Sequence, residues 1–287
     1  MQITNEEYEQ FKPLLFSIGY RLLGSVAEAE DLVQETFLKA YQIVDQEIEN
    51  KKAYLCKIMT NRCLDVLKSA RYRREQYVGP WNPEPLLFGS SPDQDPSEIV
   101  LQKEGLSIAY LRMMEHLAPD ERAVLLLREV FSFPYLEISN IIEKKEENCR
   151  KIYSRAKQKI ASIEDESLHY EKNKSIIDRF IQAFQMQNMS TLLELLSEKV
   201  ILYSDGGGKV KAALRPINTL SNVLAFLYGI SRKVPEEFYF EVKNVNGQPG
   251  LIIYMNGKIQ SVISFYIHHD TIHEIYLTMN PDKLPSQ

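Results

Sequence analysis

The sequence predicts three domains: two all-α domains followed by an α+β domain with a bent antiparallel sheet. Three observations predict this fold class. Helical periodicity runs through residues 6–75 and returns over residues 99–163. A proline-rich stretch separates these two parts. From residue 170 onward, helical segments give way to runs of β-forming residues. A length of 287 residues suits two or three domains, each with its own core.

The first helical part repeats apolar residues on one face of each expected helix. Gly24 separates the first helix from the second, and the second opens with acidic residues, as a helix dipole prefers. The third leaves its basic side chains outside. The expected helices cover residues 8–24, 28–44 and 51–75.

The linker and the second helical part follow. The stretch "GPWNPEPLLFGSSPDQDPSE" holds five of the 13 prolines, so we expect a linker that is stiff over residues 80–85 and flexible after Gly89. Residues 117–160 then read as helix, turn, helix, turn and basic helix. The cluster "EDES" at 164–167 marks the next boundary.

The last part combines helices with a meander of strands. Helices are expected in "IIDRFIQAFQM", "STLLELL" and "PINTLSNVLAFLYGI", and strands in "KVILYSD", "FYFEVKNV", "GLIIYMN", "KIQSVISFYIHHD" and "TIHEIYLTMN". The last four runs are separated by Asn246-Gly247, Asn256-Gly257 and His269-Asp270, which are turn signals of an antiparallel meander.

Composition excludes several classes. No apolar run reaches the roughly 18 residues of a membrane span, and the acidic start lacks the features of a secretory signal, so we expect a cytoplasmic protein. Cys56, Cys63 and Cys149 lack the spacing of a zinc site or a disulfide framework. We predict no metal and no cofactor.

Basic residues are segregated within a chain of formal net charge -5. One acid-poor stretch runs over residues 51–79, and residues 150–159 contain basic residues but no acid at all. Two such stretches indicate two contacts with a polyanion.

The stretch "AEAEDLVQETFLKAYQ" at 27–42 resembles the core-polymerase-binding helix of bacterial sigma factors, especially the extracytoplasmic-function group of the sigma-70 superfamily. Asp31 and Glu35 stand one turn apart and Gln34 and Leu38 flank them, so the resemblance implies that these four residues bind core RNA polymerase.

The following "NRCLDVLKSARYRRE" resembles the group's minus-ten-reading helix. The resemblance implies base reading by Asn61, Arg62 and Asp65, and promoter phosphate contacts by further basic residues. These are Lys68, Arg71, Arg73 and Arg74. A solvated basic helix is the plain alternative.

Residues 117–160 resemble the group's minus-thirty-five-binding helix-turn-helix, with Pro119 at a helix start. We assign Glu147, Asn148 and Lys151 to base edges, and the remaining polar side chains mainly to the DNA backbone. These are Arg150, Ser154, Arg155 and Lys157. The preceding "IIEKKEENCR" departs from the family pattern, because it is acidic where the family has small and capping residues.

The third domain resembles the SnoaL-like fold of the nuclear-transport-factor-two (NTF2) superfamily, which is fused to a recognisable subgroup of these sigma factors. Three motifs carry the resemblance. Trp81, Pro83, Glu84 and Pro85 form the linker motif, from which only Asn82 departs. The loop motif is Asp205, Gly206, Gly207, Gly208 and Lys209, and the tail motif is Asn280, Pro281, Asp282, Lys283 and Leu284.

The glycine triplet is not a Walker loop, because Val210 follows the lysine and no glycine stands five positions before Gly208. We interpret it as a loop that lets another backbone approach, with Asp205 and Lys209 offering opposite charges to the linker or the sigma domains. A plain surface turn or a ligand-binding loop is the alternative, and the linker could be an inert spacer.

Other functions stay open. Asp205 or Glu274 could serve an enzyme of this fold as a general base, and the aromatic strands could enclose a small ligand. His268, His269 and His273 suggest a metal cluster, but adjacent strand residues point to opposite faces, which favours a structural role.

We therefore expect a sigma factor, a monomer when free, that binds core RNA polymerase and promoter DNA, has no enzymatic activity and is regulated in cis by its last domain. The expected domains are sigma region 2 at 1–76, the linker at 77–98, sigma region 4 at 99–164 and the SnoaL-like domain at 165–287. The alternatives are a tethered SnoaL-like enzyme or ligand sensor, and a helix-turn-helix repressor that never touches polymerase.

Overall fold

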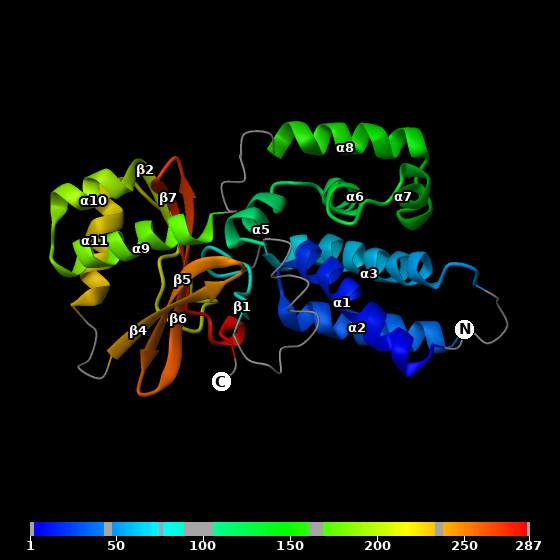
Figure 1. Cartoon of the computed structure of the whole chain (residues 1–287), viewed down its shortest axis with the longest axis horizontal. Coiled ribbons are helices and arrows are strands. Elements are labelled where there is room, and N and C mark those ends of the chain that lie inside the picture. Colours follow the sequence, from blue (N-terminus) through cyan, green and yellow to red (C-terminus); the bar gives the residue numbers. More distant parts are fainter. Residues whose placement is uncertain are drawn as a thin grey trace. The chain divides into compact units, whose positions relative to one another are not determined.

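The computed structural model describes residues 3–42, 48–74, 77–88, 106–160, 169–232 and 238–285. The chain divides into two compact units (Figure 1). Among the described residues, the first unit contains 3–74 and 111–160, and the second contains 77–88, 106–110 and 169–285. The predicted linker motif thus belongs to the second unit. The predicted flexible part of the linker after Gly89 lies outside the described residues.

The first unit begins with three helices whose ends follow local capping rules. They are α1 (Asn5–Leu23), α2 (Val26–Tyr41) and α3 (Lys51–Arg74). Thr4 and Glu7 form a capping box at the start of α1, and Gly24 ends α1 in the left-handed conformation. The Ser25 side chain then caps α2. The predicted break at Gly24 is confirmed.

The second helical part contains the predicted helix-turn-helix. After α5 (Ile108–Met114) come α6 (Pro119–Glu129), α7 (Tyr135–Ile141) and α8 (Glu146–Ile160). Pro119 stands in the first turn of α6, as predicted, where its missing N–H has no intrahelical partner to lose. Ile138 of α7 and Cys149 of α8 are fully buried between the helices.

Both helical parts pack together within the first unit. Arg122 of α6 is buried, and its Nη1 donates a hydrogen bond of 2.5 Å to the carbonyl oxygen of Leu22 near the end of α1. A cation there complements the negative end of the helix dipole. Lys52 of α3 lies 5.7 Å from the centre of the Phe133 ring. Burial raises the pKa of the Cys56 thiol on α3 to about 12, so this thiol stays protonated.

The second unit is a mixed sheet whose helices cover one face. The strands are β1 (Leu87–Phe88), β2 (Leu196–Asp205), β3 (Ile217–Asn218), β4 (Phe238–Val245), β5 (Gln248–Met255), β6 (Lys258–His268) and β7 (Thr271–Thr278), in the order β1-β4-β5-β6-β7-β2-β3. The helices are α9 (Tyr170–Gln185), α10 (Met189–Leu195) and α11 (Leu220–Ser231), followed by the short 3-10 helix η2 (Pro281–Lys283). A core that includes Phe180, Leu224 and Phe265 joins the helices to the sheet.

The meander from β4 to β7 is antiparallel, as predicted. Its turns are built from the predicted pairs Asn246-Gly247, Asn256-Gly257 and His269-Asp270, all of which have positive φ. Two-residue turns of this type match the twist of the flanking strands. Contrary to the prediction, the sheet is not purely antiparallel, because β2 pairs with β7 in the parallel direction. Parallel neighbours need a long connection, and α11 and the other strands provide it.

The linker adds a strand to this sheet. Leu87 and Phe88 of β1 pair with Val245 and Asn244 of β4. Next to them, the backbone N–H of Leu86 donates to Asn246 Oδ1 at 2.9 Å, and the backbone N–H of Asn246 donates to the Leu86 carbonyl at 2.9 Å. The linker covers apolar residues of the sheet that include Val245 and Tyr254. The sequence pattern predicted no strand here.

Across the described residues, no helix is both long and apolar enough to cross a membrane. Cys56, Cys63 and Cys149 are free and buried.

Candidate nucleic-acid interface and linker site

The outer face of α2 carries an exposed stripe. Leu32, Val33 and Phe37 are buried against the neighbouring helices, which turns the positions between them to solvent. The predicted polymerase-binding residues occupy these positions. Asp31, Gln34, Glu35 and Leu38 are all exposed. With 62% of its surface exposed, Leu38 contributes little to the core, so the stripe offers an apolar contact among polar groups.

The predicted minus-ten residues lie on α3, and most are exposed. Arg62, Asp65 and Lys68 face solvent, and Arg62 Nε lies 3.9 Å from Glu35 Oε2 on α2. Asn61 is different, because its Nδ2 donates to the carbonyl oxygen of Ile141 on α7 at 3.1 Å. The backbone of Arg71, Arg73 and Arg74 continues α3, but their side chains lie outside the described part of the chain.

The helix α8, which the sequence predicts to bind DNA, presents one polar face. Cys149, Ile152 and Ala156 are buried, and every residue predicted to bind DNA on this helix is exposed. These residues are Glu147, Asn148, Arg150, Lys151, Ser154, Arg155 and Lys157. The acidic start that departs from the family pattern has a local reason, since Glu146 and Glu147 stand at the positive end of the helix dipole.

Several cations of α8 are paired within the same unit. Arg150 lies 2.6 Å from Glu146, and Lys157 lies 3.1 Å from Glu129 on α6. Glu129 also accepts a hydrogen bond from the Tyr153 hydroxyl. The hydrogen bond from Tyr153, and then the one from Lys157, lower the pKa of Glu129. To bind a DNA phosphate, Arg150 and Lys157 would have to leave their carboxylate partners Glu146 and Glu129.

A second constellation joins the linker, the glycine loop and the tail within the second unit. Asp205 at the end of β2 is fully buried. Its Oδ1 accepts hydrogen bonds from the Tyr77 hydroxyl at 2.6 Å and the Gly207 N–H at 3.1 Å. Its Oδ2 accepts from the Asn82 N–H at 2.8 Å and Lys283 Nζ at 2.8 Å. We call these five residues the linker clamp.

Lys283 has further partners besides the Asp205 carboxylate. Its Nζ also donates to the Asn82 carbonyl at 2.7 Å, and it lies 4.1 Å from the centre of the Trp81 ring and 4.9 Å from that of Tyr77. Aromatic faces attract a cation, and the attraction strengthens where water is excluded. The exposed fraction of Lys283 is 9%, so its charge depends on these partners.

Tyr77 remains a hydrogen-bond donor in the clamp. Its burial, and then its hydrogen bond to Asp205, raise its pKa above the ordinary value for tyrosine. Asn280 Nδ2 donates to the Tyr77 hydroxyl at 3.0 Å, which ties the tail to the same group.

The glycine triplet lies where the linker and the tail approach the loop. Gly207 has a φ of 59°, and an added Cβ would lie 2.4 Å from the amide nitrogen of Asn280. Gly208 has a φ of 73°, and its added Cβ would lie 3.2 Å from Val78 of the linker. Both backbone conformations favour glycine, and a side chain at either position would crowd Asn280 or Val78.

The other predicted regulatory residues surround the clamp. Lys209 does not contact Asp205 but pairs with Asp282 of the tail at 2.6 Å. Pro83 and Pro85 are buried and Glu84 is half-buried. Pro281 begins η2, and Leu284 packs against the apolar cluster beneath the linker.

Sequence reasoning missed Tyr77 and the role of Asn82. The Asn82 side chain is fully buried and its Nδ2 lies 3.3 Å from the Leu277 carbonyl on β7. Its departure from the family pattern was the available signal.

The carboxylates considered for catalysis do not face the helix-covered core. Asp205 is engaged by four donors in the clamp. Glu274 is a residue of β7. Ile275 and Leu277 of this strand point into the core beneath the helices. Because side chains alternate along a strand, Glu274 and Tyr276 point to the opposite face of the sheet. Tyr276 donates a hydrogen bond to Glu274.

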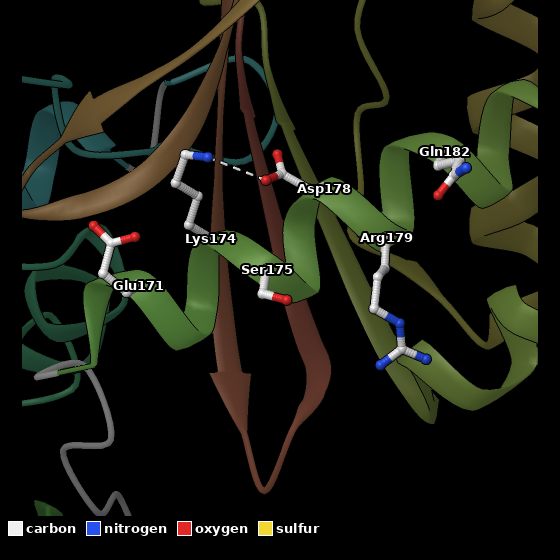
Figure 2. A pocket seen from close by; sticks show the side chains of 6 residues that line it. All are labelled: Glu171, Lys174, Ser175, Asp178, Arg179 and Gln182. Carbon is white, nitrogen blue, oxygen red and sulfur yellow. Dashed lines mark hydrogen bonds and ion pairs between the residues drawn. The ribbon is translucent and has the colours of Figure 1, made fainter.

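Two surface hollows lie beside helices of the second unit. One, of about 280 Å³, follows the outer face of α9, where Figure 2 shows Lys174 reaching Asp178. This ion pair measures 3.1 Å, and Arg179 lies 3.9 Å from Glu194, as on a solvated helix face. The other, of about 410 Å³, lies beside α10 and α11. Its lining is Gln187, Met189, Ala225, Tyr228, Gly229 and Arg232.

Comparisons with known proteins agree with both helical parts. Residues 7–73 match the family Sigma-70 region 2, and residues 107–160 match the family Sigma-70, region 4. The chain is 30% identical to the ECF RNA polymerase sigma factor SigJ of Mycobacterium tuberculosis, over 85% of this chain and 79% of that protein. It is 28% identical to the probable ECF RNA polymerase sigma factor SigI of the same species, over 94% of this chain and 91% of that protein.

The similarity extends to the second unit. The crystal structure of the M. tuberculosis extracytoplasmic function sigma factor SigJ superposes with a TM-score of 0.80 at 25% identity, covering 98% of each chain. The chain belongs to the extracytoplasmic-function (ECF) RNA polymerase sigma factors.

Proposed function

We propose that this chain directs core RNA polymerase to a specific set of promoters, and that its second unit regulates this activity in cis. The exposed stripe on α2 binds core polymerase, α3 contacts the minus-ten element, and α8 contacts the minus-thirty-five element. The observation that carries the proposal is the exposure of all three surfaces in the chain order of a sigma factor.

The contact between Asn61 and Ile141 gives this activity a conformational step. Asn61 can read a base only after its amide leaves the Ile141 carbonyl on α7. Lys57 of α3 and Glu143, which follows α7, form an ion pair of 3.0 Å that also joins α3 to the second helical part. The free chain is therefore closed between its two DNA-contacting parts, and binding to polymerase and promoter opens it.

The linker clamp is the proposed route of control. The linker joins the two DNA-contacting parts, and Asp205 and Lys283 hold one end of it on the second unit. A docked linker has fewer free residues, so it restricts how far the two parts can separate. The second unit acts through this restraint and performs no chemistry of its own, which the position of Glu274 opposite the core supports.

The test is promoter-specific transcription with purified core polymerase. The full chain should initiate at its promoters, and Leu38→Asp together with Asp31→Lys should abolish initiation while leaving the chain folded. A helix-turn-helix repressor would keep its output in this variant. A matched control is Glu9→Lys, an exposed charge reversal on α1, outside the stripe on α2.

Control in cis is tested by deleting residues 280–287, which removes Lys283 from the clamp. Initiation by this variant should differ from that of the full chain at the same promoter. Unchanged output, with the variant shown to be folded, would remove the regulatory role from the proposal.

A further inference from the structure

A third acid-poor segment lies in the second unit. Residues 206–235 contain five basic residues and no Asp or Glu, although the formal net charge of the chain is -5. The basic residues are Lys209, Lys211, Arg215, Arg232 and Lys233. Three of them stand in the loop between β2 and β3, residues 206–216, which we call the basic loop.

The basic loop presents unpaired cations. Lys211 and Arg215 are exposed, and neither has an ion-pair or hydrogen-bond partner among the described side chains. Lys209 differs, because its charge is matched by Asp282 at 2.6 Å. Between the two unpaired cations stands Leu214, which is 70% exposed. Two unpaired cations beside an exposed apolar side chain make this surface positively charged, which favours binding of a negatively charged partner.

The loop is held in place at its base. The Val210 N–H donates to the Gly206 carbonyl at 3.2 Å, and β2 pairs with β3 through Ile201 and Asn218. An added Cβ on Gly206 would lie 2.7 Å from Ala212 Cβ, so the chain folds closely on itself. The cations are thus carried on an ordered turn, and little conformational entropy is lost when they bind.

The covalent chain keeps the loop near the basic helix of the first unit. An added Cβ on Gly79 would lie 3.4 Å from the Ala213 carbonyl, so the loop contacts the linker there. Gly79 follows Arg74, the last residue of α3, by five residues. Five residues span at most about 18 Å when fully extended. This limit holds for any arrangement of the two units.

We propose that Lys211 and Arg215 bind the phosphate backbone of promoter DNA, as a third contact beyond those of α3 and α8. The inference rests on the proposed function, since it needs α3 to lie on DNA. DNA that passes the end of α3 carries one negative charge per roughly 1.7 Å, so phosphates lie within reach of the loop. The contact reads no bases and adds affinity at any sequence.

Salt dependence measures such a contact. Each phosphate that a cation neutralises contributes about 0.9 to the slope of log affinity against log salt. The test compares the full chain with the double variant Lys211→Ala, Arg215→Ala, each bound to core polymerase. The probe is a labelled 60-base-pair duplex of random sequence, titrated between about 50 and 200 mM salt.

We expect the slope to fall by about 1.8 in the variant. With equal affinities at about 1 M salt, this slope difference corresponds to roughly 60-fold weaker binding at about 100 mM salt. The matched control is Lys199→Ala, Lys258→Ala, which removes two exposed lysines elsewhere in the second unit and should leave the slope unchanged. The exchange Lys211→Arg, Arg215→Lys should keep the wild-type slope, because it conserves both charges.

Two results would overturn the inference. One is a slope equal to that of the control pair. The other is weaker binding of the double variant to core polymerase with unchanged DNA affinity, which would assign the loop to an acidic protein surface. Failure of the proposed function is distinguishable, because the wild-type chain itself would then not initiate transcription with core polymerase.

Discussion

The ion pairs of α8 and the ion pair of the linker clamp differ in their surroundings. Lys157 and Glu129 lie 3.1 Å apart with 49% and 41% of their side chains exposed. Lys283 and Asp205 lie 2.8 Å apart with 11% and 0% exposed. Similar distances therefore describe a pair in water and a pair in the protein interior.

The difference assigns the two pairs different tasks. A solvated pair contributes only about 0–1 kcal/mol, so Lys157 can leave Glu129 for a phosphate at little cost. A buried pair need not add net stability, but removing one partner leaves a buried charge at a cost of about 3–5 kcal/mol. The cations of α8 can thus exchange a carboxylate for another anion at little cost. In the clamp, loss of either charged partner destabilises the remaining contacts with the linker.

The largest expected effect is that of Asp205→Asn. The change leaves Lys283 buried without its counter-charge, so the free energy of unfolding of the second unit should fall by about 3–5 kcal/mol. Denaturant unfolding of the full chain measures it. The control is Asp282→Asn, which breaks the exposed pair with Lys209 and should cost less than about 1 kcal/mol. Equal costs would contradict the distinction drawn between the two kinds of pair.

The next effect concerns the glycine loop of the clamp. Gly207→Ala adds a Cβ against Asn280 at a φ of 59°, and we expect a cost of about 1–3 kcal/mol. Gly257→Ala is the matched control, since its φ is 72° and an added Cβ meets nothing within 4 Å. The control should cost about 1 kcal/mol, from backbone strain alone. If both cost the same in thermal unfolding, close approach of the tail does not explain Gly207.

The smallest effect is that of Glu129→Gln at the end of α6, which removes the carboxylate partner of Tyr153 and Lys157 on α8. The pKa of Glu129 is lowered by its hydrogen bonds from Tyr153 and Lys157, so its contribution is present above the unfolded pKa and is lost as pH falls through the folded pKa. At pH 7 the variant should lose less than about 1 kcal/mol. Between neutral pH and about pH 3 the wild type should lose more stability than the variant. Parallel melting curves across this range would show that the pair contributes nothing.

Local patterns predicted most of the fold. Gly24, Pro119 and the Asn-Gly turns act on their own neighbours through backbone conformation, so their structural effects follow from a few residues. The exposed stripe on α2 likewise follows from helical periodicity. Whether the named polymerase and DNA residues act as assigned stays a prediction.

Long-range pairing could not be predicted in the same way. The loop charges at Asp205 and Lys209 stood close in sequence, yet Asp205 pairs with Lys283, 78 residues away. The strand β1 pairs with β4 across more than 150 residues, and no pattern within "LLF" announces it. Such contacts form only after both segments have folded onto a common surface.

The amino-acid sequence by itself determined the helices, the turns of the meander, the exposed faces of α2 and α8, and the resemblance to ECF sigma factors. Each of these depends on residues within a few turns of one another. Only the tertiary structure decided that Asn61 is held by α7, that the linker is a strand of the second unit, and that Asp205 is buried among four donors. The physical reason is that burial and ion pairing depend on which distant segments meet, and a linear pattern does not specify that.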